Sequence, residues 1–296
     1  MRVTQTMLTR NSLYRLAQRK QNMDDIQNRI SSGRRIQRAS DDPADFSKAR
    51  RLETRISQNE QYLKNVELSE GWINNTVSLM QALSDIVIQA KDIANRGADG
   101  QADSEIRSTL ASQATSLLNE AVDIGNSKYL GKNVFAGSKT KVSQPFVLGG
   151  TNGTTVSYLG NDVRMSRKYS DTVSVEINVS GQELVDSGIF SAMENLITAL
   201  QNDDATAVNA TIDELKTAQD NLLSTTADIG ARSSNLRLIR SRLEQSNIDM
   251  ESFLSEARDA RLDYEIVNFQ NEQLSYQAAL QVTSKTIKLN IMQFLG

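Results

Sequence analysis

Apolar side chains recur at helical intervals from the start of the chain. Near the N-terminus they fall at three- and seven-residue steps and form one narrow seam: Leu13, Leu16, Met23, Ile26 and Ile30. This spacing predicts an amphipathic helix over residues 6–31. The helix should end at Gly33, because glycine readily takes the left-handed conformation that terminates helices.

A second helix is predicted from Pro43 to about Asn95. Paired aspartates precede Pro43 and supply N-cap side chains, and proline suits the first helical position. From Leu52 to Val87 the apolar pattern alternates between steps of four and three residues. At 1.5 Å per residue the helix would be roughly 80 Å long, which exceeds what a compact domain needs.

The middle of the chain combines one more helix with a β-rich insert. Residues 104–124 again carry an apolar face, and several glycines punctuate the region after them. Within residues 131–185 we expect short strands at Phe146–Leu148 and Val156–Tyr158, and an alternating strand from Val173 to Val179. The insert should lie at the surface.

Helical patterns return in the last third of the chain. We expect helices over residues 187–201 and 204–229, a break at Gly230, and a final helix with a sustained heptad. Its seam runs from Leu236 to Ala278, with a register shift near Phe269. The sequence therefore predicts a mainly α protein with a small β insert, whose two ends lie side by side.

Composition argues against catalysis. The 296 residues include no cysteine and no histidine, and aromatic residues are only 5%. The chain thus has no thiolate nucleophile and lacks the commonest general base and metal ligand. We expect no enzymatic activity, no cofactor, and no catalytic or metal site.

Charge is distributed unevenly. Residues 1–55 hold 13 Lys and Arg against 6 Asp and Glu, whereas residues 56–230 hold 12 against 22. A basic end can bind nucleic acid, but Asp41 and Asp42 directly follow the arginines and no aromatic residue lies among them to stack on bases. Complementary charge between packed subunits is the favoured interpretation, with no nucleic-acid partner.

The sequence shows no signal peptide and no membrane span. The first thirty residues disperse their apolar positions among arginines, and no run of about 18 apolar residues occurs anywhere. We expect no membrane insertion.

Three local motifs favour structural explanations. The segment from Gly125 to Asn133 resembles a phosphate-binding loop but has the wrong spacing and no Ser or Thr after the lysine. Asp41, Asp42 and Asp45 lack the spacing of a calcium loop and are better explained as helix caps. Trp72, the single tryptophan, is expected to be a packing anchor or a subunit contact.

The segment Arg29-Ile-Ser-Ser-Gly-Arg-Arg-Ile-Gln-Arg-Ala-Ser-Asp-Asp-Pro-Ala44 closely resembles the N-terminal signature of the flagellin family. The C-terminal stretch from Asp263 to Leu280, and on to Phe294-Leu-Gly296, resembles the family's other end. The resemblance covers nearly the whole chain. The opening Met1–Met7, Pro43 and the segment 126–137 are more similar to members at the hook–filament junction than to filament flagellins.

The resemblance implies a fold in three layers. These would be a terminal coiled coil of residues 1–42 with 255–296, a helical rod of 43–130 with 186–254, and an outer β-rich domain of 131–185. It implies an elongated bundle that polymerises through its ends.

The resemblance also implies a mechanical function in the bacterial flagellum, linking the hook to the filament. Implied partners are further copies in a ring, hook-associated protein 1, flagellin, and an export chaperone with the type III export apparatus. The protein would be secreted without a cleaved signal. The alternatives are filament flagellin itself and, on the heptads alone, a cytoplasmic coiled-coil adaptor.

We expect the subunit contacts to involve one set of terminal residues. These candidates are Leu16, Met23, Ile30, Arg34, Ile36, Asp41, Asp42, Pro43, Tyr276, Leu280, Ile287, Ile291 and Phe294.

Overall fold

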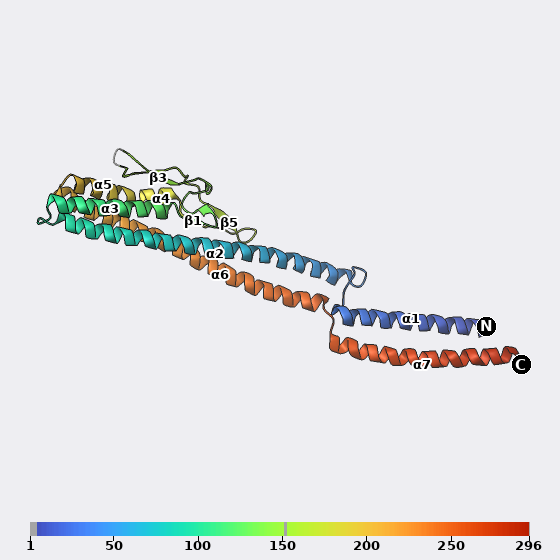
Figure 1. The fold of residues 1–296 in the computed structure, drawn as a ribbon. Coiled ribbons are helices and arrows are strands. Elements are labelled where there is room, and N and C mark those ends of the chain that lie inside the picture. Colours follow the sequence, from blue (N-terminus) through green and yellow to red (C-terminus); the bar gives the residue numbers. More distant parts are fainter. Residues whose placement is uncertain (1–4, 151–152, 296) are drawn as a thin grey trace. The chain divides into compact units, whose positions relative to one another are not determined.

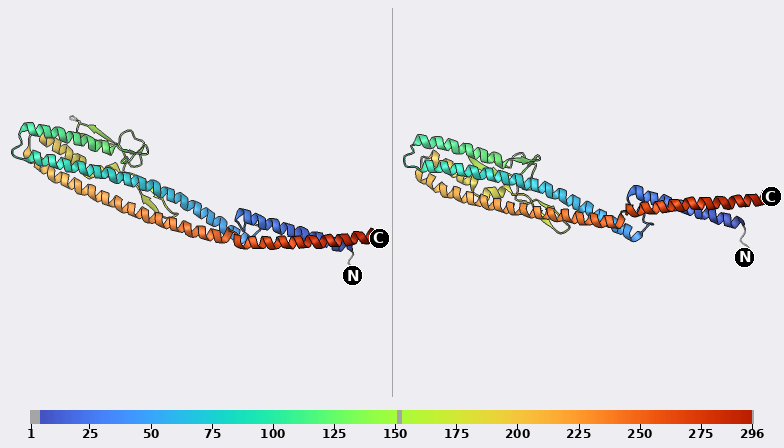
Figure 2. Two further views of the ribbon diagram at one scale, coloured as in Figure 1. Left: turned by 60° about the horizontal axis from the view of Figure 1, so that its bottom comes forward. Right: turned by 90° about the horizontal axis from the view of Figure 1, so that it is seen from below.

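The computed structural model describes residues 5–150 and 153–295, and only the backbone of residues 5, 6, 8 and 286–295. The chain divides into two compact units, drawn in Figures 1 and 2. The terminal unit comprises residues 1–58 with 246–296, and the central unit comprises residues 59–245. Each is described separately below.

The terminal unit is built mainly from two paired helices. Helix α1 is Gln5–Ser32 and helix α7 is Leu262–Leu295. They lie side by side in both figures, and they run antiparallel because the end of α1 meets the start of α7, where the Ala260 amide donates to the Gly33 carbonyl. The prediction that the two ends of the chain pair is confirmed.

The start of α2 (Pro43–Ala98) and the end of α6 (Ala205–Arg258) also belong to the terminal unit. Gly33 has φ +68, which ends α1 as predicted. The Asp42 carboxylate accepts hydrogen bonds from the amides of Ala44 and Asp45 and so caps α2. Capping by this aspartate is confirmed.

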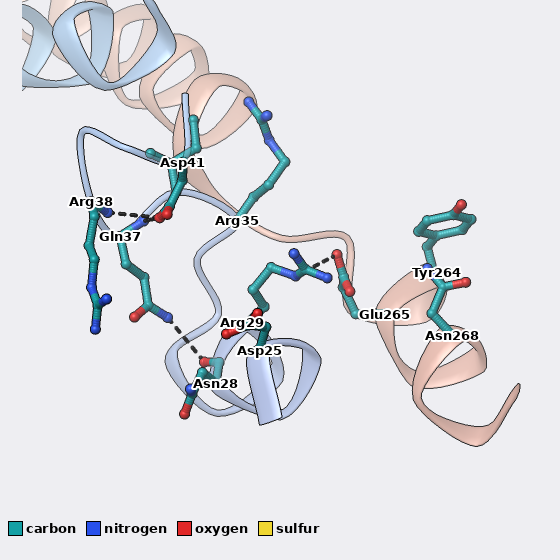
Figure 3. Close-up of a pocket in the computed structure, with 11 residues that line it drawn as sticks. Asp25, Asn28, Arg29, Arg35, Gln37, Arg38, Asp41, Tyr264, Glu265 and Asn268 are labelled. Carbon is teal, nitrogen blue, oxygen red and sulfur yellow. Dashed lines mark hydrogen bonds and ion pairs between the residues drawn. The ribbon is translucent and has the colours of Figure 1, made fainter. Parts of the chain in front are cut away.

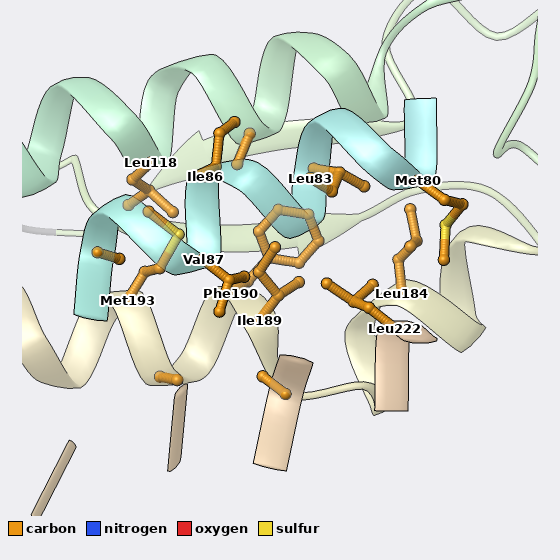
Figure 4. Close-up of a cluster of buried hydrophobic side chains, with 14 of the residues drawn as sticks. Met80, Leu83, Ile86, Val87, Leu118, Leu184, Ile189, Phe190, Met193 and Leu222 are labelled. Carbon is orange, nitrogen blue, oxygen red and sulfur yellow. The ribbon is translucent and has the colours of Figure 1, made fainter. Parts of the chain in front are cut away.

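The central unit packs the remaining helices around one apolar core. With the central parts of α2 and α6 it contains α3 (Ser104–Gly125), α4 (Gly181–Asp186) and α5 (Ile189–Gln201). Figure 4 shows side chains from all five helices meeting in this core. Trp72 is 6% exposed there and meets Tyr129 edge-on, so its predicted role as a packing anchor is confirmed.

Three antiparallel strand pairs form the β insert of the central unit. They are β1 (Lys128–Tyr129) with β2 (Lys132–Asn133), β3 (Phe146–Gly149) with β4 (Thr155–Tyr158), and β5 (Ser166–Lys168) with β6 (Ser174–Glu176). In the second pair Phe146 stands opposite Tyr158, and their rings are 5.1 Å apart. The mainly α fold with a small β insert is confirmed.

Two expectations about the insert were wrong. The strand predicted from Val173 to Val179 is limited to Ser174–Glu176, because residues 177–180 are all buried and lead directly into α4. That short helix lies within the stretch expected to be β-rich, and the Ser180 hydroxyl caps it by accepting from the Glu183 amide. Gly188, with φ +84, then separates α4 from α5.

The break predicted at Gly230 was also wrong, because α6 runs through it without interruption. Glycine inside a helix costs about 1 kcal/mol relative to alanine, which long flanking helices can absorb. The chain breaks instead at residues 259–261. There the carbonyl of Arg258, the last residue of α6, accepts hydrogen bonds from the amides of Arg35 and Ile36.

The segment that resembles a phosphate-binding loop has a different structure. Gly125 is the last residue of α3, and Lys128–Asn133 form the β1–β2 hairpin. A phosphate loop would instead lead into the N-terminus of a helix. Among the described residues, no helix is long and apolar enough to cross a membrane.

Candidate subunit-contact site at the paired chain ends

One face of α1 packs against α7. The buried and half-buried residues of this face recur at steps of three and four: Thr9, Ser12, Leu16, Arg19, Met23, Ile26 and Ile30. Ile26 is the most enclosed of them at 9% exposure. Leu13, which the sequence pattern placed in the seam, is instead 52% exposed, because the contact face lies one step to its side.

The matching face of α7 is unexpectedly polar. Its buried and half-buried positions follow the same rhythm: Glu265, Phe269, Glu272, Tyr276, Ala279 and Thr283. Glu265 is 8% exposed and Thr283 is 7% exposed. Much of the α1–α7 contact therefore consists of carboxylates, a hydroxyl and a small side chain, with few of the large apolar residues that α7 carries.

Two ion pairs cross between these helices. Arg29 Nε lies 3.3 Å from Glu265 Oε1, and Arg19 Nη1 lies 3.1 Å from Glu272 Oε2. The side chains of the two glutamates are only 10% and 17% exposed. Removing one partner of so enclosed a pair leaves a charge without compensation, so these contacts define how α1 and α7 pair.

The connector between α1 and α2 is held against the end of α6. The Arg35 amide donates to the Arg258 carbonyl over 2.8 Å, and the Arg35 guanidinium donates to Asp45 over 2.6 Å. Arg258 in turn donates to Glu53 over 3.0 Å. Ile36 is 3% exposed and supplies the apolar anchor of the connector.

Asp41 organises the same connector. Its Oδ2 accepts hydrogen bonds from the amides of Arg38, at 2.9 Å, and Gln37, at 3.0 Å. These two hydrogen bonds, that from Arg38 first, lower the pKa of the Asp41 carboxyl below its ordinary value. The side chain is fully exposed, so its role is to shape the loop.

A cleft of about 520 Å³ opens between the end of α1, the connector and the start of α7 (Figure 3). Arg29 and Glu265 point toward each other within it. Glu265 Oε2 is buried but has no hydrogen-bond partner within the described chain. Charged groups of both signs line the remaining walls, including Arg38 and Asp25. This cleft can accept a polar side chain that donates a hydrogen bond.

Several large apolar side chains of α7 face away from α1. Tyr264 is 61% exposed, Val267 53%, Leu274 65% and Val282 65%. Tyr264, Val267 and Leu274 belong to the heptad predicted from the sequence, so the α7 part of that seam is uncovered within the single chain. Exposed apolar residues of this number on one helix indicate a contact surface.

The structure brings together most of the predicted contact residues in the terminal unit. Leu16, Met23, Ile30 and Tyr276 are half-buried, whereas Leu280 is 43% exposed. A second group surrounds the connector: Arg34, whose backbone bridges to Asp259, then Ile36, Asp41, Asp42 and Pro43. The side chains of Ile287, Ile291 and Phe294 lie outside the described residues.

Sequence reasoning missed the charged residues of the contact. Arg19, Arg29, Glu265 and Glu272 were not among the candidates, although the two glutamates stand one heptad apart. That spacing was the available signal, because residues seven apart share one face of a helix.

Comparison with known proteins identifies the terminal signature. Residues 3–140 match the family model described as the bacterial flagellin N-terminal helical region. This part of the chain, somewhat under half of its length, is similar to the flagellin family. A flagellar filament 30.7 kDa core protein of Treponema maltophilum is 22% identical to this chain over 283 residues. The match covers 93% of this chain and 94% of the relative.

Other similar proteins are hook-associated. Flagellar hook-associated protein 3 of Salmonella typhimurium is 22% identical over 291 residues, covering 87% of this chain and 86% of the relative. Among solved structures, a putative flagellar hook-associated protein from Vibrio parahaemolyticus matches with a TM-score of 0.67 and 20% identity. That match covers 74% of this chain and all of the Vibrio chain, and it shows that the two share a fold.

Proposed function

We propose that this protein is a structural subunit of the bacterial flagellum that joins the hook to the filament. Residues 3–140 match the flagellin family, and the relatives include both a filament protein and hook-associated proteins. A subunit that resembles filament proteins can continue their packing, and a hook-associated one must also contact a different neighbour. A junction combines these two requirements.

The observation that carries the proposal is the uncovered apolar seam of α7. A chain that used α1 as its only partner would place these side chains against it, yet Val267 and Leu274 face outward. Neighbouring subunits would cover this seam and bury area that contributes roughly 25 cal/mol per Å². The polar α1–α7 contact would set the register in which the two helices pair.

The terminal segments, residues 1–42 and 255–296, are assigned the polymerising role. The candidate contact residues lie in these segments and at the adjoining start of α2, in the terminal unit. The cleft beside Glu265 offers a place for a hydrogen-bond donor from a neighbour, because Oε2 has no partner within the described chain.

The proposal includes no catalytic role. The matched family is a family of structural flagellar proteins, and the sequence lacks histidine and cysteine. Its partners would be further copies of itself in a ring, hook-associated protein 1 on one side and flagellin on the other. An export chaperone and the flagellum's type III apparatus would deliver the chain to the outside of the cell without cleaving a signal.

Electron microscopy of a deletion strain tests this proposal. Loss of the protein should leave hooks in place and release flagellin into the medium, with no filaments attached. Filaments that still attach to hooks in the deletion strain would contradict the junction role.

Filament flagellin is the second candidate, because one relative is a filament core protein. It predicts that the purified protein alone builds long helical filaments. The junction role predicts at most short assemblies that need an added hook or filament end, so electron microscopy of the purified protein separates the two.

A further inference from the structure

The tip of the β1–β2 hairpin in the central unit combines strain with exposure. Leu130 has φ +48 and the following Gly131 has φ +74. A two-residue hairpin turn with both residues in this region favours asparagine or aspartate before glycine, because a leucine side chain crowds the backbone in the left-handed conformation. Leucine is thus a costly choice at this position.

Packing within the chain does not explain that choice. Leu130 is 73% exposed, more than any other large apolar side chain among the described residues. Backbone strain held at an exposed side chain points to a functional constraint.

The hairpin is rigidly anchored behind its tip. Tyr129 meets Trp72 edge-on, with ring centroids 5.9 Å apart, and its hydroxyl lies where a Cβ on Gly71 would stand. Asn133 is buried and its side-chain amide donates to the carbonyls of Val142 and Thr140. The backbone that carries Leu130 is therefore fixed before any partner binds, which lowers the conformational entropy lost on binding.

Lysines surround this tip. Lys128 and Lys132 flank the turn, Lys139 and Lys141 follow closely in the chain, and all four are exposed. None of them forms an ion pair within the described part of the chain. An exposed apolar side chain flanked by unpaired positive charge fits an acidic surface with a hollow in it.

The central unit itself carries such a hollow. A groove of about 480 Å³ lies between α5 and α6, with Gly188, Ala192 and Ala218 among its lining residues. Ala192 and Ala218 are 2% and 0% exposed, so their short side chains form the base of the groove above which a leucine could lie. Serine, threonine and asparagine residues line the groove as well, together with three acidic residues: Asp186, Asp213 and Glu214. These three carboxylates likewise have no ion-pair partner in residues 5–150 and 153–295.

We propose that the Leu130 knob of one copy docks into the α5–α6 groove of a second copy. The match of an apolar, lysine-ringed tip with a hollow, acid-lined groove carries the assignment. Because knob and groove are different surfaces, the contact is heterologous and can repeat around a ring. The inference rests on the proposed function, since it requires copies that assemble.

Engineered cysteines test the contact directly, because the natural chain has none. One copy carries Leu130→Cys and a second carries Thr217→Cys, at an exposed position in the groove lining. Co-expressed in a deletion strain and oxidised, the two should give a disulfide-linked dimer. Each variant expressed alone should give none. A mixture without the dimer, in cells whose filaments still attach, overturns the docking.

The same mixture in purified form separates this inference from the proposed function. If the deletion strain keeps its filaments, the junction role fails, and cross-linking of the concentrated purified copies still tests the contact. A dimer formed by Leu130→Cys copies alone would indicate a contact between two knobs and would also overturn the proposal.

Leu130→Asn supplies a test that does not depend on cross-linking. It creates the preferred Asn-Gly turn, so the thermal midpoint should stay equal or rise. Association of copies should weaken about tenfold or more, because burying a leucine contributes at least that factor to an equilibrium constant. Leu159→Asn, at another leucine with 54% exposure, is the matched control and should change neither. Equal association of both variants would overturn the proposal.

Discussion

The central and terminal units use their apolar residues in opposite ways. In the central unit Met80, Leu83 and Val87 are completely buried among side chains from five helices. In the terminal unit Leu274 is 65% exposed, whereas Glu265 on the same helix, α7, is 8% exposed. The central unit therefore completes its own core, whereas the terminal unit leaves large apolar side chains exposed, and in the proposed assembly neighbouring subunits would cover them.

This contrast has a physical rationale in an assembling protein. A purely apolar α1–α7 contact would be strong but unselective, and it would compete with contacts between copies. Enclosed ion pairs contribute little net stability, but they penalise wrong registers because a misplaced charge stays uncompensated. The ion pairs can thus keep α1 and α7 in register, while the apolar side chains of α7 stay available for contacts with other copies.

The largest effect is expected in the central core. Leu83→Ala removes a fully buried side chain and leaves a cavity, so it should lower the free energy of unfolding by about 2–5 kcal/mol. Denaturant unfolding of the full chain, followed by Trp72 fluorescence, measures this change.

Leu274→Ala in α7 is the matched variant for that measurement. Its side chain is exposed, so the same truncation should change the free energy of unfolding by no more than about 0.5 kcal/mol. It should nevertheless reduce incorporation into flagella. Equal destabilisation by the two variants would show that the units do not differ as described.

An intermediate effect is expected at the enclosed ion pair of the terminal unit. Glu265→Gln leaves Arg29 without its carboxylate partner. Because the arginine side chain is 34% exposed, the free energy of unfolding should fall by about 1–2 kcal/mol. Amide hydrogen exchange of α1 should speed up accordingly. Arg261→Gln, which breaks a largely exposed ion pair with Asp263, is the control and should leave exchange in α1 unchanged.

The smallest effect is expected from pH. The folded pKa of Asp41 lies below its ordinary value of 3.8, because the Arg38 and Gln37 amides donate to it. Its contribution to stability is therefore complete above pH 3.8 and is lost as the pH falls through the lower folded pKa. Acid titration should show the connector loosening in this window, and Asp41→Asn should remove that part of the pH dependence. If Asp41→Asn loses stability with falling pH in the same way as the natural protein, this role of Asp41 is contradicted.

The sequence predicted the helices well, because their signals are local. Gly33 ends α1 through its left-handed backbone, and Asp42 with Pro43 starts α2, as their side-chain chemistry dictates. The heptad spacing also predicted that the ends pair. Ile36 was recognised as a candidate, and it is buried in the connector.

The break between α6 and α7 was not predictable, because no local signal marks it. Arg258 ends α6 where its carbonyl receives amide hydrogen bonds from the distant connector at Arg35 and Ile36. Gly230 carried the stronger local signal for a helix end. The helical residues on both sides of it nevertheless keep α6 continuous through this position.

The face that α7 turns toward α1 was equally hidden. Periodicity alone assigns the apolar residues Val267 and Leu274 to the inside of a pair, and only the enclosed glutamates reveal that they face outward. A hydrophobic pattern states which residues avoid water in the final assembly, and it does not state which chain covers them.

Limited proteolysis of the purified monomer, read by mass spectrometry, tests the central claim most directly. If neighbours complete the terminal unit, α1 and α7 should be cut first, and a fragment close to residues 43–254 should survive. If α1 and α7 resist the protease for as long as the helices of the central unit, the terminal unit is complete in the single chain and the account is contradicted.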